Sequence, residues 1–471
     1  MPAVGIFYDD VMLRCPQPHL PFGRRYDRSN FPSPKVGFAS QGNMKYTDLW
    51  GGELLDRLEC LFCGKKYPLN VFKVFCPECR EPMLVSSPPR HRSFALDRPL
   101  SLEKYQDFLP LAHIDRTLSL GEGGTPLLAL GRIRRKHYLP PVFAKNEAVN
   151  PTHSFKDRGT AVAIQKAKAL GITRVGTVST GNMAGSTAAY GAKAGLKTVV
   201  LLKEDTPSDK IRAAGAYGPI LLKVKGDYGA LFSRSLEIGQ KRGIYFMNSI
   251  DPLRIEGYKV TGYEIFHELG GRIPRFLFVP VSSGGHLLGL MKAFLDLKKQ
   301  GYATDMPVCV GVQAKGCSPL ANAFASGKAR CSRFPRPKTI AHAITNPSPP
   351  GGTILLKLVR ENRGLIMAVT DPEILAAQRE LAELEGIFAD PASATALAAL
   401  IRLSRSQRLS LRDESVLVIT GSGLKSMETA ERLAVEVHRS RGSKKRCRFL
   451  GHERNSRIRC RAPEFHKRRF E

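Results

Sequence analysis

The 471-residue sequence contains no uninterrupted run of about 18 apolar residues, which is the length that a membrane-spanning helix needs. Its first apolar patch holds Asp9 and Asp10, and the N-terminus lacks the basic, apolar and small-residue order of a secretory signal peptide. No internal repeat is apparent. These absences predict a cytoplasmic protein without a membrane segment, and the ordinary apolar content of 42% favours globular domains over disorder.

Acidic residues are scarce, since 42 Asp and Glu stand against 72 Lys and Arg and give a formal net charge of +30. This balance raises nucleic-acid binding as an alternative function. Much of the excess lies in 439–471, a segment without apolar periodicity that predicts an appended, disordered tail. The tail leaves non-specific binding of nucleic acid open, although it has few aromatic side chains for base stacking. The charge of the remaining chain suits an anionic substrate.

The ten cysteines show no disulfide framework, but four of them form two CxxC pairs. These pairs are Cys60-Leu-Phe-Cys63 and Cys76-Pro-Glu-Cys79. Two such pairs at this separation can place four thiolates tetrahedrally around one zinc ion. The alternatives are free thiols or disulfides, and disulfides are disfavoured because the rest of the chain indicates an intracellular enzyme. The spacing therefore predicts a structural zinc site in a small zinc-ribbon-like module.

Lys156 lies in the segment 145–159, just ahead of a helix that we expect to begin near Arg158 and to run to Ala169. A partly desolvated lysine at the mouth of an α/β sheet can lose its proton and form a Schiff base with an aldehyde cofactor. An ordinary surface cluster of charges at a helix start is the alternative. The segment alone does not decide between them.

Three further segments, 178–187, 276–289 and 416–425, each combine a hydrophobic strand with a loop of glycine and small hydroxyl residues. Where such a loop leads into a helix, backbone N–H groups are free to bind an anion. The first loop suits a carboxylate. The second lacks the lysine of a nucleotide-binding P-loop and suits a small phosphate monoester. Each loop alone is compatible with an ordinary turn, but the combination with a reactive lysine favours a cofactor site.

The ordered motifs NPTHSFKDRG, STGNMAGSTAAYGAKAGL, NSIDPLRIEGYK, VPVSSGGHLLG, EGIFADPASATALAAL and VITGSGLK resemble those of the threonine synthase family. That family belongs to the fold type II pyridoxal-phosphate enzymes, the tryptophan synthase β-subunit superfamily. The resemblance covers about Glu59 to Val437, and LGEGGTPL at 120–127 strengthens it. It implies a homodimeric, pyridoxal 5'-phosphate-dependent lyase that converts O-phosphohomoserine and water to threonine and phosphate. Many archaeal and bacterial members carry a ribbon-like N-terminal module.

The resemblance also implies a role for individual residues. Lys156 would hold the cofactor as a Schiff base and act as the base for the α-proton. Asn182 would bind the ring hydroxyl oxygen and Ser422 would face the pyridine nitrogen. The phosphate of the cofactor would be bound by the backbone of Ser283, Gly284, Gly285 and His286. The substrate would be bound through its carboxylate by Ser179, Thr180 and Gly181, and through its leaving phosphate by Asn248, Ser249 and Arg254.

Two departures from the family pattern bear on the reaction. The STGN loop usually continues with threonine, and here Met183 follows. The phosphate loop usually has the form G-N-x-G-N, whereas this chain has Ser282-Ser-Gly-Gly-His286. Ser283 therefore replaces an asparagine whose side chain would also reach the leaving phosphate. Both changes are compatible with the cofactor site but touch the part that would bind the substrate phosphate.

The chain divides into an N-terminal extension at 1–55, with Met44 as an alternative start, the ribbon-like module at 56–87, a catalytic region at 88–438 and the basic tail. Strand-like and helical runs alternate through the catalytic region, which predicts an α/β fold of two interleaved parallel-sheet domains. The strands are expected at 175–178, 197–202, 220–224, 244–247, 276–281, 308–312 and 416–419. Helices are expected at 208–216, 230–241, 372–384 and 427–437.

Other activities remain open at this point. A paralogue of the family could act as a cysteate synthase on O-phosphoserine and sulfite, or as a serine or threonine ammonia-lyase. A shorter substrate would leave less room at the phosphate pocket, which Met183 could then fill. A protein of another class, a nucleic-acid-binding pseudoenzyme that uses the ribbon and tail, is the last alternative.

Overall fold

The structure, a computed structural model, describes residues 56–87, 94, 100–179, 181–204, 213–225, 228–406, 410 and 412–426. These residues belong to one compact unit that spans 53–471. The predicted N-terminal extension, the helix at 427–437 and the basic tail lie outside the described residues. Within the described part of the chain, no helix combines the length and the apolar character needed to cross a membrane.

Two parallel sheets form the catalytic region and confirm the predicted α/β fold. The larger sheet has the strand order β12-β11-β10-β13-β5-β4, and only β4 runs antiparallel to its neighbour. Its strands are β4 (Leu127–Ala129), β5 (Val142–Asn146), β10 (Phe276–Pro280), β11 (Val308–Ala314), β12 (Leu365–Val369) and β13 (Ser415–Ile419). The sequence predicted β10, β11 and β13 but missed β4, β5 and β12.

The smaller sheet is inserted between β5 and β10 in the sequence, so the two α/β units are interleaved. Its four strands run parallel in the order β8-β7-β6-β9. They are β6 (Arg174–Val178), β7 (Lys197–Lys203), β8 (Ile220–Val224) and β9 (Tyr245–Phe246). All four were predicted, because each is a short apolar run bounded by turn residues.

Helices cover both faces of each sheet, so successive side chains along a strand pack against helices on opposite faces. In β10, Phe276 and Phe278 pack into one apolar cluster with α10 and α11, while Leu277 and Val279 pack on the opposite face with α7 and α9. Strands buried on both faces are continuously hydrophobic, as found here. The helices are α1 (Gly131–His137), α2 (Lys156–Ala169), α3 (Asn182–Lys193), α5 (Tyr228–Arg242), α6 (Pro252–Glu268), α7 (Gly285–Lys299), α8 (Pro319–Ala325), α9 (Gly352–Glu361), α10 (Asp371–Glu385) and α11 (Pro391–Arg405).

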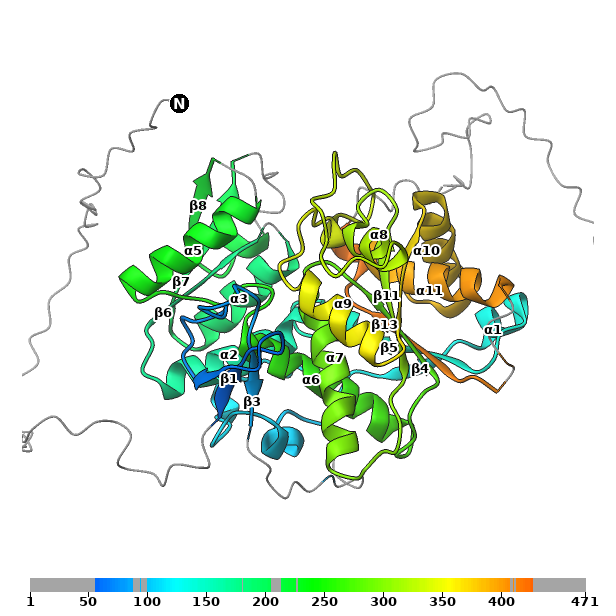
Figure 1. Ribbon diagram of the computed structural model, residues 1–471, viewed down its shortest axis with the longest axis horizontal. Helices are drawn as coiled ribbons and strands as arrows, with labels where there is room; N and C mark the ends of the chain where they lie inside the picture. Colours follow the sequence, from blue (N-terminus) through cyan, green and yellow to red (C-terminus); the bar gives the residue numbers. More distant parts are fainter. Residues whose placement is uncertain are drawn as a thin grey trace, which may run out of the picture. The chain divides into compact units, whose positions relative to one another are not determined.

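The helices α2 and α6 lie between the two sheets, where α6 packs against both α2 and α7 (Figure 1). Local sequence sets where the helices start. Asp251 caps α6 and Asp390 caps α11, each followed by a proline in the first turn, and Thr370 with Glu373 forms a capping box on α10. The helix α2 starts at Lys156, two residues earlier than predicted, so Lys156 is the first residue of the helix rather than a residue ahead of it.

The ribbon-like module consists of three short antiparallel strands in the order β2-β1-β3. These are β1 (Arg57–Glu59), β2 (Lys66–Pro68) and β3 (Leu84–Ser86). Its two CxxC turns share one geometry. The N–H of Gly64 donates to the Cys60 carbonyl and the N–H of Arg80 donates to the Cys76 carbonyl, and both donors have a positive φ. The repeated turn places the four cysteines around a common centre.

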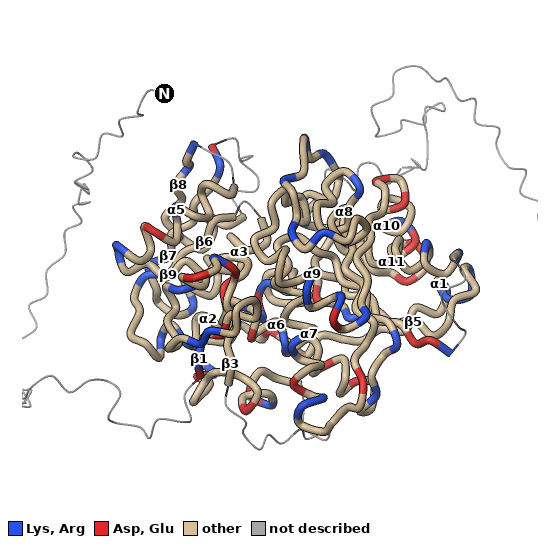
Figure 2. Tube along the Cα trace, viewed as in Figure 1, with Lys and Arg blue, Asp and Glu red and all other residues tan. Residues whose placement is uncertain are grey.

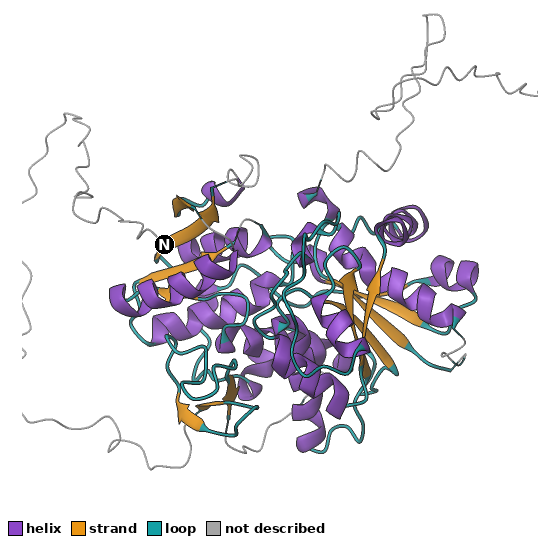
Figure 3. Ribbon diagram, turned by 45° about the horizontal axis from the view of Figure 1, so that its top comes forward, coloured by secondary structure: helices purple, strands orange, loops and turns teal. Residues whose placement is uncertain are grey.

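The ribbon-like module packs onto the catalytic region at more than one point. Val74 lies in an apolar cluster with Phe232 of α5 and Ile250, the residue after Ser249. The Lys357 side chain of α9 donates to the Leu61 carbonyl at 2.8 Å, and the Lys292 side chain of α7 donates to the Val85 carbonyl at 2.6 Å. The module therefore contacts helices of both α/β units. Figure 3 shows its short strands below the helices of the catalytic region.

Charged segments of both signs are interspersed over the catalytic region (Figure 2). Basic residues fill the last turn of α1, where they complement the partial negative charge of a helix C-terminus. In this view, the described residues show no single basic stripe. The tail at 439–471, for which nucleic-acid binding was left open, lies outside the described residues.

The crossing of α2 and α6 depends on two glycines. A Cβ on Gly257 would lie 2.2 Å from the Arg158 carbonyl oxygen and 2.7 Å from the Gly159 Cα. Gly257→Ala should therefore lower the free energy of unfolding by about 1–3 kcal/mol or more through overpacking. Chemical denaturation measures this. Gly185→Ala in α3 is the matched control, since its Cβ would meet nothing within 4 Å, and it should be neutral or stabilising. Equal effects of the two variants would contradict the prediction.

Candidate active site

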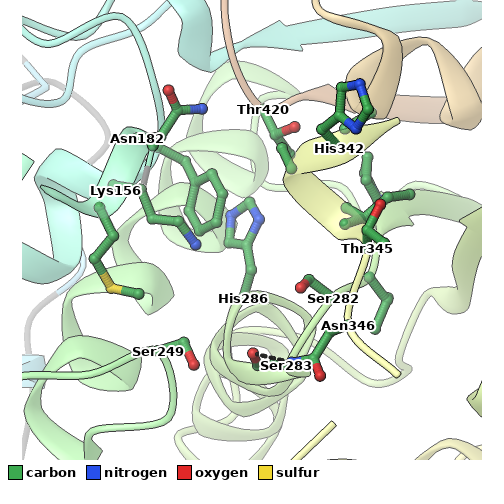
Figure 4. A pocket seen from close by; sticks show the side chains of 18 of the residues that line it. Lys156, Asn182, Ser249, Ser282, Ser283, His286, His342, Thr345, Asn346 and Thr420 are labelled. Atoms are coloured by element: carbon green, nitrogen blue, oxygen red, sulfur yellow. Dashed lines mark hydrogen bonds between the residues drawn. The ribbon is translucent and has the colours of Figure 1, made fainter. Parts of the chain in front are cut away.

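A cavity of about 250 Å³ lies at the carboxyl ends of strands from both sheets. In open α/β folds ligands bind at this edge, because the loops after the strands converge there. The lining comes from seven segments of the chain, and Figure 4 shows labelled side chains from most of them around one space. These segments are 155–156, Ser179 with 181–183, Ser249, 280–287, 342–346, Asp390 with Ala392, and Thr420 with 425–426.

Lys156 points into this cavity from the first turn of α2. Its Nζ lies 4.0 Å from the centroid of the Phe155 ring and 6.0 Å from that of Tyr258. Desolvation, helped by the nearby Arg254 charge, lowers the pKa of Lys156 from 10.5 to about 7, while Asp390 opposes the shift. A substantial fraction of the amine is therefore neutral near neutral pH, which is the form that attacks a carbonyl or accepts a proton.

The two residues after Lys156 fix the start of α2. The Asp157 carboxylate accepts hydrogen bonds from the Thr152 N–H and hydroxyl, both at 2.6 Å. Arg158 is buried and binds two carboxylates, each through two nitrogen–oxygen contacts of 2.5–2.7 Å. These carboxylates belong to Glu147, which directly follows β5, and to Glu264 of α6. Buried ion pairs of this kind have one favourable geometry. They therefore fix the first turn of α2 and, with it, the direction of the Lys156 side chain.

The same buried cluster holds the LGEGGTPL segment. The Gly124 N–H donates to Glu264 Oε1 at 2.8 Å, and the Thr125 hydroxyl donates to Glu147 Oε1 at 2.7 Å. Lys145 of β5 lies 2.8 Å from Glu264. Burial alone would raise the pKa of Glu264, but Arg158 and Lys145 lower it to about 2, so this carboxylate stays ionised.

The loop between β6 and α3 supplies the second side of the cavity. Asn182 is the first residue of α3, and Met183 beside it is buried and lines the cavity. A Cβ on Gly421 would lie 3.2 Å from Asn182 Nδ2 and 3.0 Å from Asp390 Oδ2. Gly421 of the VITGSGLK motif therefore lets these two polar groups come close to the backbone.

The loop between β10 and α7 supplies the third side. Gly284 has a φ of +100°, and a Cβ on Gly285 would lie 2.4 Å from the Ser249 carbonyl oxygen, so the loop needs both glycines. The free N–H groups at the start of α7 face the cavity and make an anion-binding site. His286 is 6% exposed and stacks on Phe155, with 3.8 Å between ring centroids.

His286 has no hydrogen-bond partner on either ring nitrogen among the described residues. Desolvation, followed by the charges of Lys156 and Arg158, holds its pKa well below the ordinary value. The ring is therefore neutral, with one nitrogen able to donate and the other able to accept. Ser249 Oγ is likewise buried without a partner in the described structure. Unpaired polar groups around one cavity indicate that it binds a polar ligand.

A protein-family profile described as pyridoxal-phosphate dependent enzyme matches residues 118–421. The matched region includes Lys156 and every cavity-lining residue except Lys425 and Ser426. The chain belongs to the pyridoxal-phosphate dependent enzymes. Within the matched region, Lys156 and the start of α7 lie on one cavity.

Among individual proteins, the chain is similar to threonine synthases. A threonine synthase of Methanocaldococcus jannaschii is 33% identical over 384 residues, which cover 80% of this chain and 95% of that protein. A threonine synthase of Methanosarcina acetivorans is 35% identical over 380 residues, covering 79% and 93%. The solved structure of the processed form of threonine deaminase isoform 2 from Solanum lycopersicum shares the fold, with a TM-score of 0.57, 18% identity and coverage of 73% and 98%.

Most residues that the sequence assigned to this pyridoxal-phosphate site line the cavity. They are Lys156, Ser179, Gly181, Asn182, Ser249, Ser283, Gly284, Gly285 and His286. Thr180 lies outside the described residues. The cavity thus brings together segments that are separated by more than a hundred residues in the sequence.

Three predicted residues do not line the cavity. Ser422 Oγ accepts a hydrogen bond from the Leu424 N–H at 3.2 Å and caps a short helical turn, and Thr420 takes the place at the cavity wall. Asn248 Oδ1 accepts from the Val178 N–H at 2.9 Å, and its Nδ2 donates to Ser235. Arg254 is buried and donates to the Met247 carbonyl and the Thr187 hydroxyl, both at 2.7 Å. The side chains of Asn248 and Arg254 thus support the loops around the site.

Other residues of the cavity were missed from the sequence. Asp390 stands in a motif that carried the resemblance, but Asp-Pro before a helix is also an ordinary cap, which it makes here with the Ser393 N–H at 2.7 Å. Burial raises the pKa of Asp390 to about 6. Asn346 lies in a proline-rich loop without any strand or helix signal. Only the folded chain brings Asn346 next to Ser283.

The low pKa of Lys156 can be tested directly in protein stripped of cofactor. Only the neutral amine reacts with an amine-selective reagent, so the rate of labelling at Lys156 should rise with pH through a midpoint near 7. Peptide mass spectrometry of protein labelled briefly at each pH measures the midpoint. Asp390→Asn should lower it further, because the Asp390 charge raises this pKa. A midpoint near the ordinary 10.5 would contradict the described environment.

Proposed function

We propose that the protein is a threonine synthase, a pyridoxal-phosphate-dependent lyase that forms threonine and phosphate from O-phosphohomoserine and water. Identity of 33–35% to threonine synthases, over almost their whole length, carries this proposal. The cavity supports it, because it combines a lysine, an anion site at a helix N-terminus and further unpaired polar groups. A small anionic amino acid matches this set of donors.

The residues present fit pyridoxal 5'-phosphate. Lys156 would bind its aldehyde carbon, and the backbone N–H groups from Ser283 to His286 would bind its phosphate. Asn182 would bind the ring hydroxyl oxygen. Thr420 replaces Ser422 as the proposed partner of the ring nitrogen, because Thr420 lines the cavity. When bound, the cofactor supplies an aldehyde carbon that joins an amine and an electron-poor ring that stabilises negative charge at the adjacent carbon.

The chain's own groups would then position the substrate and move its protons. Backbone N–H groups of the Ser179–Gly181 loop would bind the substrate carboxylate, near the start of α3. Lys156 would remove the proton from the substrate Cα, since an amine with a pKa of about 7 exchanges protons readily at neutral pH. The Arg254 charge helps to keep Lys156 neutral, and this becomes the proposed role of Arg254 in place of direct contact with the phosphate.

The leaving phosphate would bind where Ser249 points. Ser249 is 7% exposed, and its buried Oγ has no partner within the described structure, so a ligand oxygen can form a hydrogen bond with it. Asn248 supports this position indirectly by binding the end of β6 through the Val178 N–H. Of the three residues that the resemblance assigned to the phosphate, we therefore retain Ser249 for direct contact.

Product analysis tests the proposed function. Holoenzyme incubated with O-phosphohomoserine should release threonine and phosphate in equal amounts, and Lys156→Ala should abolish both products. Lys168→Ala is the matched control, because Lys168 is exposed on the same helix, and it should leave turnover unchanged. Release of phosphate without threonine, or of neither from well-folded holoenzyme, would contradict the proposal.

A second candidate is a related reaction on a shorter substrate. Met183 is buried and lines the cavity next to Asn182, where it reduces the space for a longer side chain. The same assay with O-phosphoserine plus sulfite, and with serine or threonine alone, separates a cysteate synthase or an ammonia-lyase from a threonine synthase. Assembly as a homodimer in the cytoplasm also remains a prediction from the resemblance.

We also propose that the ribbon-like module binds one structural zinc ion through Cys60, Cys63, Cys76 and Cys79. The four Sγ atoms lie within 4.8 Å of one another. Three of their separations are 3.3, 3.7 and 3.8 Å, close to the roughly 3.8 Å expected for a tetrahedral site with zinc–sulfur bonds of about 2.3 Å. The thiols are not joined as disulfides. A thiolate set without a free position suits a structural metal rather than a catalytic one.

Zinc content tests this site. Purified protein should hold about one zinc per chain, and Cys60→Ser should lose it and melt at a lower temperature, because structural zinc contributes directly to folding. Elemental analysis and thermal unfolding measure the two effects. Cys331→Ser is the control, since Cys331 lies outside the four-cysteine cluster. Equal zinc content in the two variants would contradict the proposal.

A further inference from the structure

Ser283 and Asn346 form a polar pair in the wall of the cavity (Figure 4). Asn346 Nδ2 donates a hydrogen bond to Ser283 Oγ at 2.9 Å. Ser283 belongs to the loop before α7, and Asn346 follows a short helical turn at His342–Ile344. They are 7% and 6% exposed, so the pair is shielded from bulk water and faces the cavity.

The local backbone fixes the orientation of the Asn346 side chain. Its Oδ1 accepts a hydrogen bond from the Ser348 N–H at 3.1 Å, and its own N–H donates to the Ile344 carbonyl at 2.9 Å. The carboxamide oxygen is thus occupied, and the nitrogen faces Ser283. An amide nitrogen carries two hydrogens, and within the described structure only Ser283 receives one. Asn346 therefore has a second N–H to offer a ligand.

The hydrogen bond also sets what Ser283 can do. Because Ser283 Oγ accepts from Asn346, its own hydroxyl hydrogen is free to donate. A hydroxyl that accepts one hydrogen bond becomes a better donor in the next. The pair therefore offers two donors at the same place, the Ser283 hydroxyl and the second Asn346 N–H. No acceptor side chain among the described residues occupies either of them.

Ser249 brings a third donor to this end of the cavity. Its carbonyl oxygen lies against Gly285 at the start of α7, and its hydroxyl is buried without a partner in the described structure. Figure 4 shows Ser249 and Ser283 on the same side of the cavity. Three uncharged donors next to a helix N-terminus match a group with several acceptor oxygens. A phosphate monoester has three such oxygens, whereas the hydroxyl of serine or threonine has one.

We infer that Asn346, held by Ser283, is a specificity-determining residue that binds the phosphate group of the substrate. The pattern G-N-x-G-N has an asparagine at the position of Ser283, and here the carboxamide is supplied from another loop. This inference rests on the proposed function, because it assigns one contact to the proposed substrate. It also explains how the chain can lack that asparagine and still recognise a phosphorylated amino acid.

Substrate and product binding to Asn346 variants of the holoenzyme test the inference. Asn346→Ala should raise KM for O-phosphohomoserine about tenfold to a hundredfold, the loss expected for one hydrogen bond to a charged group. The Kd for L-threonine should change by less than about twofold, because threonine has no phosphate. The absorbance of the cofactor measures this binding. Asn346→Asp should be worse, because it sets a carboxylate against the phosphate.

Rescue gives the sharper arm of the experiment. Ser283→Asn in the Asn346→Ala background should recover most of the lost affinity, because it restores a carboxamide to the phosphate loop. Asn362→Ala, a change in the terminal turn of α9 that removes a hydrogen bond to Leu358, is the matched control and should alter neither constant. Equal losses for both ligands without rescue would assign Asn346 a purely structural role and overturn the inference, as would an unchanged KM.

The failure of the proposed function is distinguishable from the failure of this inference. If wild-type holoenzyme forms no threonine from O-phosphohomoserine, the proposed reaction is wrong. Binding of inorganic phosphate to the same holoenzyme then decides the inference by itself. Weaker phosphate binding by Asn346→Ala than by wild type supports the phosphate contact, and equal binding refutes it.

Discussion

The position of Lys156 depends on the buried contact between Arg158 and the carboxylates of Glu147 and Glu264. Glu147 follows β5 of the larger sheet, and Glu264 belongs to α6, which packs against α2 and α7. Replacing such a buried cluster by apolar residues often leaves stability unchanged, but removing a single partner costs about 3–5 kcal/mol. We therefore regard the cluster mainly as a device that fixes geometry. It holds the first turn of α2, and Lys156 is the first residue of that turn.

The rest of the site follows from this arrangement. With α2 fixed, the low-dielectric surroundings and the Arg254 charge keep Lys156 largely neutral, while the start of α7 offers its N–H groups across the same cavity. The LGEGGTPL segment lies outside the cavity lining and serves the same cluster through Gly124 and Thr125. This motif thus supports the site by binding the carboxylates around Arg158, and it does not contact the cavity itself. The ribbon-like module also supports the site without lining it, because its Val74 packs in one apolar cluster with Ile250, the neighbour of Ser249.

The sequence could predict those parts of the site whose roles depend on local backbone. Lys156, Asn182 and the residues from Ser283 to His286 stand at the ends of strands or the starts of helices, where the carboxyl edge of a parallel sheet must gather them. The choice between Ser422 and Thr420 depends on where the chain turns after β13, which no local pattern fixes. The hydrogen-bond partners of Asn248 and Arg254 lie on other elements of the fold. Their buried polar groups bind these partners instead of pointing into the cavity, which the sequence alone does not show. Asn346 joins the site only through tertiary contact with Ser283. Strand β5 ends in Lys145 and Asn146, which weaken its apolar pattern. Strand β12 is a run of five apolar residues, and periodicity alone does not distinguish such a run from a buried helix segment.

The most direct test of this account is a double-mutant cycle between Arg158→Met and Glu264→Gln, measured by the free energy of unfolding and by threonine formation. Each single variant should be destabilised by several kcal/mol, and the losses should be non-additive by more than about 1 kcal/mol. Both variants should also lose turnover under conditions where they are folded. Additive losses together with wild-type turnover in the folded variants would show that the cluster does not position Lys156, and would contradict the account.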